Sequence, residues 1–405
     1  MLPRNPNMLL HKGEATRRAS FLELFFDLVF VFALTRVVAR AVEDLTGRAA
    51  IHQPEAVFAG ATKTLFLVLA LWSVWHGSAW TTSRYDPYQP IVQSTVLIAL
   101  VASMVMGVAI PRAFSVNAVA FVAGYLIAQL SRSLLLAIAL RGHEQQRLEL
   151  RIFITYSATA VLWILGLIFA WSGARLLFWL PALVIEYLAN RFGWPVPGLG
   201  RSAPHTWSIA GEHLAERYQQ FFLVALGEAV LVTGLTYSSG SRNPASTAAF
   251  AVTIAASILI WRIYFYRAGQ IFAEAVRQSR RPAQIGSSAA DSHLLITTGV
   301  ITTAIGFELT IAQPTGNTPF AWLPVILGGP ALYMVGRSRF EYEVFNRVSP
   351  SRIVAVGLLL ALIPVLLRAP PLAVMSAAAV VLTGVALADA QRARGKPPEP
   401  PAPPM

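Results

Sequence analysis

Cysteine is absent from the sequence and charged residues are few, and each shortage excludes a class of protein. Without cysteine the chain forms no disulfide and offers no thiolate to a metal or a substrate. Only 13% of the 405 residues are charged, whereas soluble domains carry about 25%. Hydrophobic residues reach 55%. This composition predicts an integral membrane protein whose main partner is the lipid bilayer.

Motifs of common enzymes are also missing from the chain. It contains no glycine-rich phosphate-binding loop, no G-x-S-x-G motif and no H-E-x-x-H motif, and no long polar segment separates its apolar stretches. These features count against ATP-driven transport and against an enzyme with a soluble substrate. We therefore expect no cofactor, no metal and no catalytic residue, and an enzyme is the less favoured alternative.

The net charge of +12 would indicate a nucleic-acid partner in a soluble protein. Here the basic residues lie between apolar segments, which indicates membrane topology instead, so we expect no nucleic acid. With the N-terminus in the cytoplasm, most basic residues fall in cytoplasmic connections. The opposite connections hold only Arg48, Arg112, Arg175, Arg242 and Arg368, with Arg36 and Arg40 near the end of the first span. Both termini are therefore predicted to be cytoplasmic.

Apolar segments of about 17–25 residues, the length that crosses a bilayer, recur twelve times. They begin near Phe21, Val57, Ile91, Phe114, Arg151, Ala174, Leu214, Thr247, His293, Phe320, Arg352 and Pro371. The first resembles a signal peptide, but the acidic residues in its apolar core favour an uncleaved span. The sequence thus predicts an all-α, polytopic helical bundle of about twelve transmembrane helices.

Composition also divides the chain. We expect a cytoplasmic segment at 1–20, a six-helix half at 21–192, a linker rich in proline and glycine at 193–212, a second six-helix half at 213–390 and a disordered, proline-rich tail at 391–405. A second polar, basic linker is expected between Arg277 and Asp291. Gly124 to Arg132 matches Gly329 to Arg337 in spacing, which predicts a six-plus-six internal repeat with both halves in the same orientation.

Two carboxylates interrupt the first apolar segment. Glu23 and Asp27 are four residues apart, so they share one face of a helix. An ionised carboxylate in hydrocarbon costs several kcal/mol, so this face is expected to meet protein or water. The alternative for Glu23 is a position at the headgroup level, paired with Arg17 or Arg18.

A second acidic helix follows the central linker. Glu216 and Arg217 lie at its start, and Glu228 lies deep in its apolar part. Gly227 is expected to let another backbone come close to Glu228. A carboxylate at this depth suits proton binding or cation coordination. The alternative is a structural ion pair with Arg217, or with Arg262 or Arg132 of neighbouring helices.

These two acidic runs also carry a family resemblance. FLELFFDLVFVFA at 21–33 and GEHLAERYQQFFLVALGEAV at 211–230 resemble the signatures of the bacterial low temperature requirement A family. The resemblance covers most of the chain and implies a multi-pass protein of the bacterial inner membrane. It implies no established biochemical activity, because the family is named for a growth phenotype.

Several other polar residues lie in apolar segments. His76 shares a face with Trp72, and packing is its simpler interpretation. Glu186 is expected to reach the interface. For Arg132 and the equivalent Arg337, a salt bridge within each half, to Asp27 or Glu216, is a sharper alternative to a role as positive-inside anchors. The full set of candidate ion- or substrate-binding residues is Glu23, Asp27, His76, Arg132, Glu216, Arg217, Glu228, Arg262, His293 and Glu308.

Three functions are compatible with these residues. The favoured one is a secondary transporter or ion-conducting protein that binds a small ion or a proton at buried carboxylates. The second is an intramembrane enzyme that acts on a lipid by acid–base chemistry. The third is a structural or sensory membrane protein for growth in the cold, whose charges only hold helices together.

Overall fold

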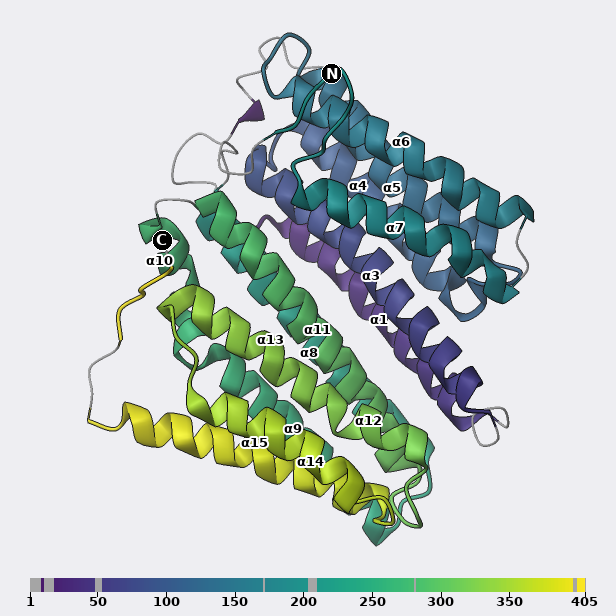
Figure 1. Ribbon diagram of the computed structural model, residues 1–405, viewed down its shortest axis with the longest axis vertical. Helices are drawn as coiled ribbons and strands as arrows, with labels where there is room; N and C mark the ends of the chain where they lie inside the picture. Colours follow the sequence, from purple (N-terminus) through teal and green to yellow (C-terminus); the bar gives the residue numbers. More distant parts are fainter. Residues whose placement is uncertain are drawn as a thin grey trace. The chain divides into compact units, whose positions relative to one another are not determined.

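The computed structural model describes residues 9–10, 18–47, 53–169, 172–202, 210–279, 282–395 and 399–404. Throughout these residues every regular element is a helix (Figure 1). The prediction of an all-α protein is confirmed. Helices begin where the sequence fixes a first turn: α4, α9, α14 and α15 each carry proline there, where no backbone N–H is needed.

Eight helical stretches in the described part are long and apolar enough to cross a membrane. They are formed by α3 (Pro54–Arg84), α4 (Pro90–Ala109), α5 (Ala118–Ala139), α6 (Gln146–Phe169), α8 (Gly211–Ser239), α9 (Pro244–Tyr264), α11 (Pro282–Ala312) and α15 (Pro371–Ala393). The other α-helices are α1 (Phe21–Thr46), α7 (Leu176–Arg191), α10 (Gln270–Gln278), α12 (Leu323–Ile326), α13 (Gly328–Phe345) and α14 (Pro350–Val365). The architecture is that of a polytopic helical membrane protein.

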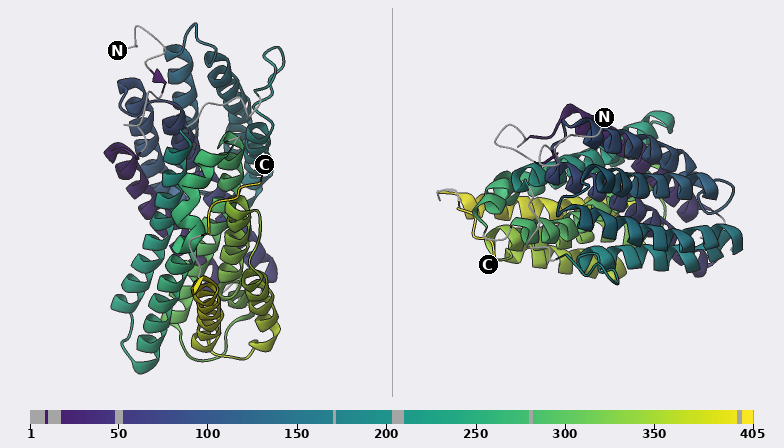
Figure 2. Two further views of the ribbon diagram at one scale, coloured as in Figure 1. Left: turned by 90° about the vertical axis from the view of Figure 1, so that its left-hand side faces the viewer. Right: turned by 90° about the horizontal axis from the view of Figure 1, so that it is seen from above.

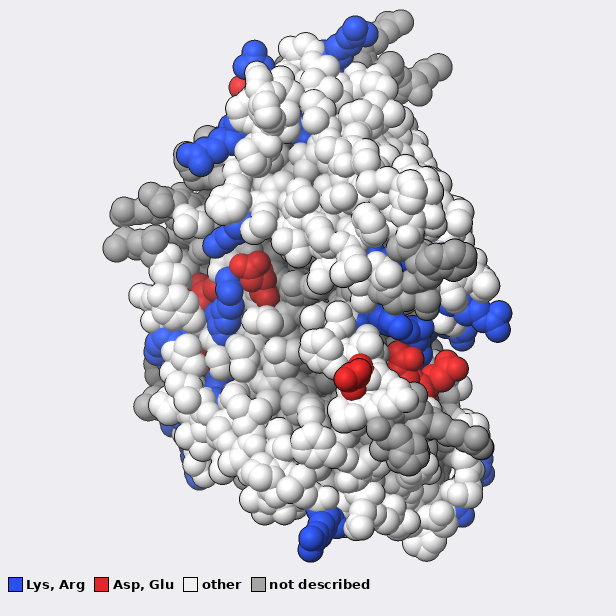
Figure 3. All heavy atoms as spheres, turned by 45° about the vertical axis from the view of Figure 1, so that its right-hand side comes forward, with Lys and Arg blue, Asp and Glu red and all other residues white. Residues whose placement is uncertain are grey.

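The surface agrees with this architecture. Figure 3 shows one face on which most atoms belong to uncharged residues, and the acidic groups that it shows lie next to basic ones. Large apolar side chains such as Phe21, Leu177 and Val365 are more than 70% exposed. In water such a surface would drive aggregation, whereas hydrocarbon chains of a bilayer can cover it.

The chain forms two compact units. The first comprises Met1–Val37, Thr62–Arg217 and Arg281–Gln284, and the second comprises Val38–Ala61, Tyr218–Arg280 and Ile285–Met405. The helices α1, α3, α8 and α11 each contribute residues to both units.

In the first unit, α4, α5, α6 and α7 pack against one another in chain order (Figure 2). Gly124 allows α5 to approach the backbone of α4 closely, because a Cβ atom there would lie 2.7 Å from the carbonyl oxygen of Ala102. Phe66, Trp163 and Trp179 form an aromatic core with ring centroids 5.6–6.0 Å apart. These contacts position the inward-facing polar residues of α3, α5, α6 and α7.

In the second unit, α15 packs against both α9 and α14, and α14 packs against α13. Glycines allow α11 and α13 to touch: a Cβ atom on Gly299 would lie 2.4 Å from the backbone nitrogen of Tyr333. The run from α9 to α10 contains a π-helical turn, Phe265–Gly269, with Arg267 in the left-handed region at φ 54°. A side chain with a Cβ is strained in this conformation, so packing must hold the turn.

Two connecting segments can be compared with expectation. The polar linker expected between Arg277 and Asp291 is largely absent, since α11 already begins at Pro282. A polar run continues a helix when one face of it packs, and Ala289 and Ala290 are buried there. In the tail, Glu399 and Ala402 contact Arg347 and the backbone of Val344.

Candidate functional site

An ion-pair network joins the beginnings of α1 and α8 in the first unit. Arg217 donates two hydrogen bonds to Asp27, from Nη1 to Oδ2 at 2.8 Å and from Nη2 to Oδ1 at 2.7 Å. The indole N–H of Trp75 donates to the same carboxylate at 2.9 Å. The guanidinium of Arg217 also lies 5.8 Å from the centre of the Trp75 ring. This bidentate geometry is the strongest form of the arginine–carboxylate pair.

Glu23 completes the network. Its Oε1 lies 3.5 Å from Nε of Arg217, and its Oε2 lies 3.2 Å from Nε2 of His213. The other ring nitrogen of His213 is 2.9 Å from the hydroxyl of Ser83. Glu23, His213 and Arg217 are each at most 1% exposed. Glu23 pairs with His213 and Arg217 and not with Arg18, which is exposed, because the Glu23 side chain is buried against α8; Arg17 lies outside the described residues.

The structure therefore brings Glu23, Asp27 and Arg217 together; the shared face of the two acids was predicted, whereas Arg217 as their partner was not. Arg217 is not a direct partner of Glu228. Asp27 pairs with Arg217, whereas the sequence analysis had suggested Arg132. Glu216 is half-buried at the edge of this network and accepts a hydrogen bond from the backbone N–H of Ala19 at 3.1 Å. Desolvating so many charges together is favourable only when each one is paired.

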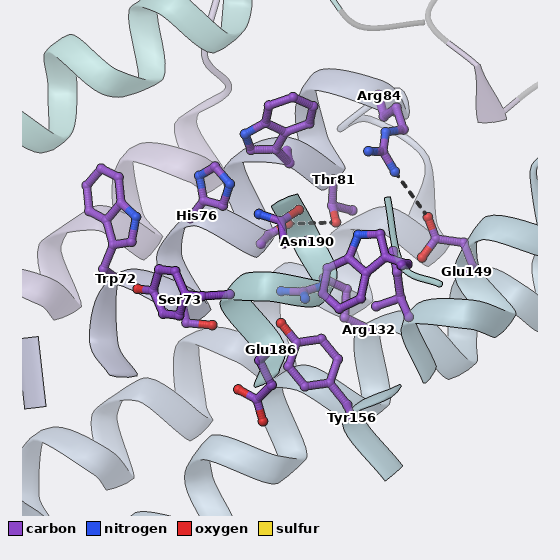
Figure 4. Close-up of a pocket in the computed structure, with 15 residues that line it drawn as sticks. Trp72, Ser73, His76, Thr81, Arg84, Arg132, Glu149, Tyr156, Glu186 and Asn190 are labelled. Carbon is purple, nitrogen blue, oxygen red and sulfur yellow. Dashed lines mark hydrogen bonds and ion pairs between the residues drawn. The ribbon is translucent and has the colours of Figure 1, made fainter. Parts of the chain in front are cut away.

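A cavity of about 60 Å³ lies within the first unit, among α3, α5, α6 and α7 (Figure 4). Its aromatic walls include Trp72, Trp80, Tyr156 and Trp194. Polar side chains enter from every side: His76, Arg84, Arg132, Glu149, Glu186 and Asn190. A space of this size holds roughly four water molecules. Two of the sequence-predicted residues, His76 and Arg132, thus share one cavity.

A chain of buried hydrogen bonds runs along one wall of this cavity. Nη2 of Arg132 donates to Oε1 of Gln129 at 2.6 Å, and Nε2 of Gln129 donates to the hydroxyl of Ser73 at 2.8 Å. That hydroxyl is 3.3 Å from the hydroxyl of Tyr125, which donates to Glu186. Such a network fixes the orientation of each member, because a change at one position leaves a buried partner unsatisfied.

The expectation that Glu186 reaches the interface is wrong. It is 2% exposed and accepts hydrogen bonds from Tyr125, from Thr159 at 2.7 Å and from the indole of Trp163 at 3.1 Å. Its place near the end of α7 suggested snorkelling, whereas the tertiary fold covers that end.

Glu149 was missed by the sequence analysis. It accepts a hydrogen bond from the hydroxyl of Tyr85 at 2.9 Å and lies 3.7 Å from Arg84. In the sequence Glu149 stands between Arg147 and Arg151, and this pattern is typical of a charged residue at the membrane interface. Its position among apolar residues that begin a span, with Leu148 and Leu150 on either side, was the only available signal.

The second unit contains a carboxylate of a different kind. Glu228 is 0% exposed, and neither of its oxygens has a hydrogen-bond partner in the described part of the chain. The half-buried Glu308 of α11 is close enough for its charge to act on Glu228. The expectation for Gly227 is wrong: a Cβ atom there would meet nothing within 4 Å.

The remaining candidates of this unit lie elsewhere. His293 is buried between Tyr264, whose hydroxyl is 2.8 Å from Nε2, and the carbonyl of Ala289, 2.7 Å from Nδ1. Its ring stacks on Tyr218 at 4.9 Å. Arg262 is half-buried and reaches the carbonyl of Ala386 at 3.5 Å. Both arrangements are those of satisfied packing residues.

A second ion-pair network, also missed, holds α13, α14 and α15 together. Arg352 donates to both oxygens of Asp389 at 2.7 and 2.9 Å, and its Nε lies 2.8 Å from Glu341. The sequence did carry a signal, since Arg352 and Asp389 stand at the edges of the last two apolar segments. Within the described ranges, no group of three or more His, Asp or Glu side chains is arranged to hold a metal ion.

Comparison with known proteins gives the family. The family model described as bacterial low temperature requirement A protein matches residues 18–387, which is most of the chain. The chain belongs to the bacterial low temperature requirement A family. Both acidic runs, around Asp27 and Glu228, lie inside the matched region.

A relative from Rhizobium meliloti (strain 1021), described as an uncharacterized protein, is 29% identical over 374 residues. The match covers 91% of this chain and 88% of that protein. No solved structure matches this member of the family. Family and relative thus identify the protein without assigning it an activity.

Proposed function

We propose that this protein is a secondary transporter or ion-conducting protein of the bacterial inner membrane, and that Glu228 binds the transported proton or cation. The observation that carries the proposal is a carboxyl group that is completely buried and has no hydrogen-bond partner among the described residues. Such a group costs several kcal/mol in a membrane if it is ionised, so it is seldom present without a use.

The surroundings of Glu228 support a binding role. The side chain whose charge acts on Glu228 is another carboxylate, Glu308, and not a basic residue. A proton would remove the cost of burying the charge, and a bound cation would offset it. A structural acid would instead be paired, as Asp27 and Asp389 are.

The topology that we propose has twelve spans with both termini in the cytoplasm. Four further helices, α1, α7, α13 and α14, coincide with the predicted segments that are outside the eight long apolar ones. The six-plus-six repeat is supported by its matched arginines. Arg132 and Arg337 are both buried, and each has an Nη1 atom without a hydrogen-bond partner in the described part.

Flux into proteoliposomes tests the proposal. Purified protein is reconstituted with a dye inside that is sensitive to protons, sodium or potassium, and a gradient of the same ion is applied. We expect flux of at least one of these ions, abolished in Glu228→Gln and reduced in Glu308→Gln. Glu274→Gln is the matched control, because Glu274 lies near the surface of α10 beside Arg277. Flux that is equal in wild type and Glu228→Gln would remove Glu228 from the mechanism.

The two ion-pair networks suit the third function, a structural one, but at other residues. Asp27 and Glu23 are tied to Arg217 and His213 so completely that an ion could reach them only by breaking these contacts. We propose that these acids hold the start of α1 against the start of α8. The predicted acids of the two halves then have different tasks, one pairing helices and the other binding an ion.

A further inference from the structure

We propose that the cavity of the first unit is a binding site for a small anion, held by the guanidinium group of Arg132. The anion has the chemistry of a short carboxylate or a planar monovalent oxyanion. This site does not include Glu228 and goes beyond the ion binding proposed above. The anion-site proposal does not depend on the proposal for Glu228.

Arg132 has a donor that no described residue uses. The side chain is 5% exposed and lines the cavity (Figure 4). Nη2 donates to Gln129 and the guanidinium also interacts with the hydroxyl of Tyr156, whereas Nη1 has no hydrogen-bond partner among the described residues. No carboxylate in the described part lies within 4 Å of this guanidinium, although other buried or half-buried arginines have such a partner, among them Arg40, Arg84, Arg217, Arg267 and Arg352. A buried cation with an open donor is costly unless an anion or water meets it.

The helix opposite is shaped for this guanidinium. A Cβ atom on Gly77 of α3 would lie 2.0 Å from Nη1 and 2.5 Å from Cζ of Arg132. Only glycine therefore leaves room for the group at this place. Gln129 fixes its orientation through the hydrogen-bond chain to Ser73, Tyr125 and Glu186. Gly77 and Gln129 therefore fix the position and the orientation of the Arg132 guanidinium in the absence of a ligand.

The carboxylates of the cavity do not compete for the open donor. Glu149 is paired with Arg84 and Tyr85, and Glu186 is held by three neutral donors. Two cations, Arg84 and Arg132, thus act on Glu149, and the open space of the cavity remains between them and the aromatic walls. Among the described residues Arg84 has a carboxylate within 4 Å and Arg132 has none, so an anion in the cavity would be the first acidic group in direct contact with Arg132.

The size of the cavity limits the anion. About 60 Å³ accommodates roughly four non-hydrogen atoms, at 10–15 Å³ for each water-sized group. A planar carboxylate or oxyanion matches the planar donor edge of a guanidinium. The rings of Trp72, Trp80 and Trp194 form apolar walls that favour a weakly hydrated or short-chain anion over a multiply charged one.

Binding is measured on the full chain, purified in detergent without carboxylate buffers. Sodium formate is titrated at constant ionic strength, with sodium gluconate as an anion too large for the cavity. Heat of binding and intrinsic fluorescence are both followed, because three tryptophans line the site. We expect a saturable response to formate and none to gluconate.

Gln129→Glu is the decisive variant. It places a carboxylate where an oxygen already lies 2.6 Å from Nη2 of Arg132. This carboxylate pairs with Arg132 and so competes with an added anion. We expect formate affinity to fall at least tenfold while the thermal unfolding temperature stays equal or rises. Arg132→Gln should also lose binding. Arg339→Gln in the second unit, where the side chain is 41% exposed, should bind as wild type does.

Two results would overturn the proposal. One is the lack of a saturable response to formate, acetate or nitrate in the wild-type protein. The other is Gln129→Glu protein that is folded and binds formate as tightly as wild type does. Neither result bears on ion flux through Glu228, so the two proposals can fail separately.

Discussion

Replacing Asp27 by asparagine keeps the shape of the side chain and removes its charge. Arg217, which is 1% exposed, then loses the partner that it binds at 2.7 and 2.8 Å. Breaking a buried ion pair on one side typically costs about 3–5 kcal/mol. Glu23 remains 3.5 Å from Nε of Arg217 and compensates part of the charge. We therefore expect Asp27→Asn to lower the free energy of unfolding by about 3 kcal/mol, the lower end of that range.

Double variants separate the charge effect from a general loss of packing. Adding Glu23→Gln to Asp27→Asn removes both acids near Arg217. We expect this double variant to lower the free energy of unfolding by about 5 kcal/mol, the upper end of the same range. Adding Arg217→Gln to Asp27→Asn removes the stranded cation instead. We expect this double variant to regain part of the stability that Asp27→Asn loses, with a coupling energy of about 1–3 kcal/mol between the two positions.

Thermal unfolding in detergent, followed by intrinsic fluorescence, measures these differences. A decrease of about 3 kcal/mol in the free energy of unfolding lowers the thermal unfolding temperature by roughly 6–12 °C for a folding unit of 150–250 residues. Glu274→Gln serves as the control for removal of an acid near the surface. Asp27→Asn protein that unfolds at the wild-type temperature, or an Arg217→Gln addition that worsens it further, would refute the claim that this pair stabilises the fold.

Glycine and the second ion-pair network give further tests. Gly299→Ala should destabilise by about 1–3 kcal/mol, because the new methyl group meets backbone atoms of α13 at 2.4 Å. Gly227→Ala, which meets nothing within 4 Å, should be neutral or stabilise by up to about 1 kcal/mol through helix propensity. Asp389→Asn should lower the free energy of unfolding by about 3 kcal/mol, because Arg352 loses Asp389 and keeps Glu341 as its acidic partner. The same thermal assay checks all three, and equal behaviour of the two glycine variants would contradict the packing described for α11 and α13.

The pairing of charges required the tertiary structure. The sequence placed Glu23 and Asp27 on one helix face and indicated that this face meets protein. It did not indicate that the partner is Arg217, which lies 190 residues away along the chain. Spacing along one helix gives a face, whereas the partner depends on which helices become neighbours and how each is rotated. For the same reason the burial of Glu186 and the cavity beside Arg132 were not predicted.

The sequence by itself determined that this protein is helical, multi-spanning and a member of its family. Apolar length and scarce charge are sufficient for the first two, because in a bilayer the backbone must satisfy its own hydrogen bonds, and helices do so locally. The tertiary structure alone decided which buried charges are paired. Asp27 is matched, whereas Glu228 and Arg132 are left with unused hydrogen-bonding atoms in the described part of the chain. The pairing energy of a charge depends on distances of a few ångströms between helices, and no local pattern of residues contains those distances.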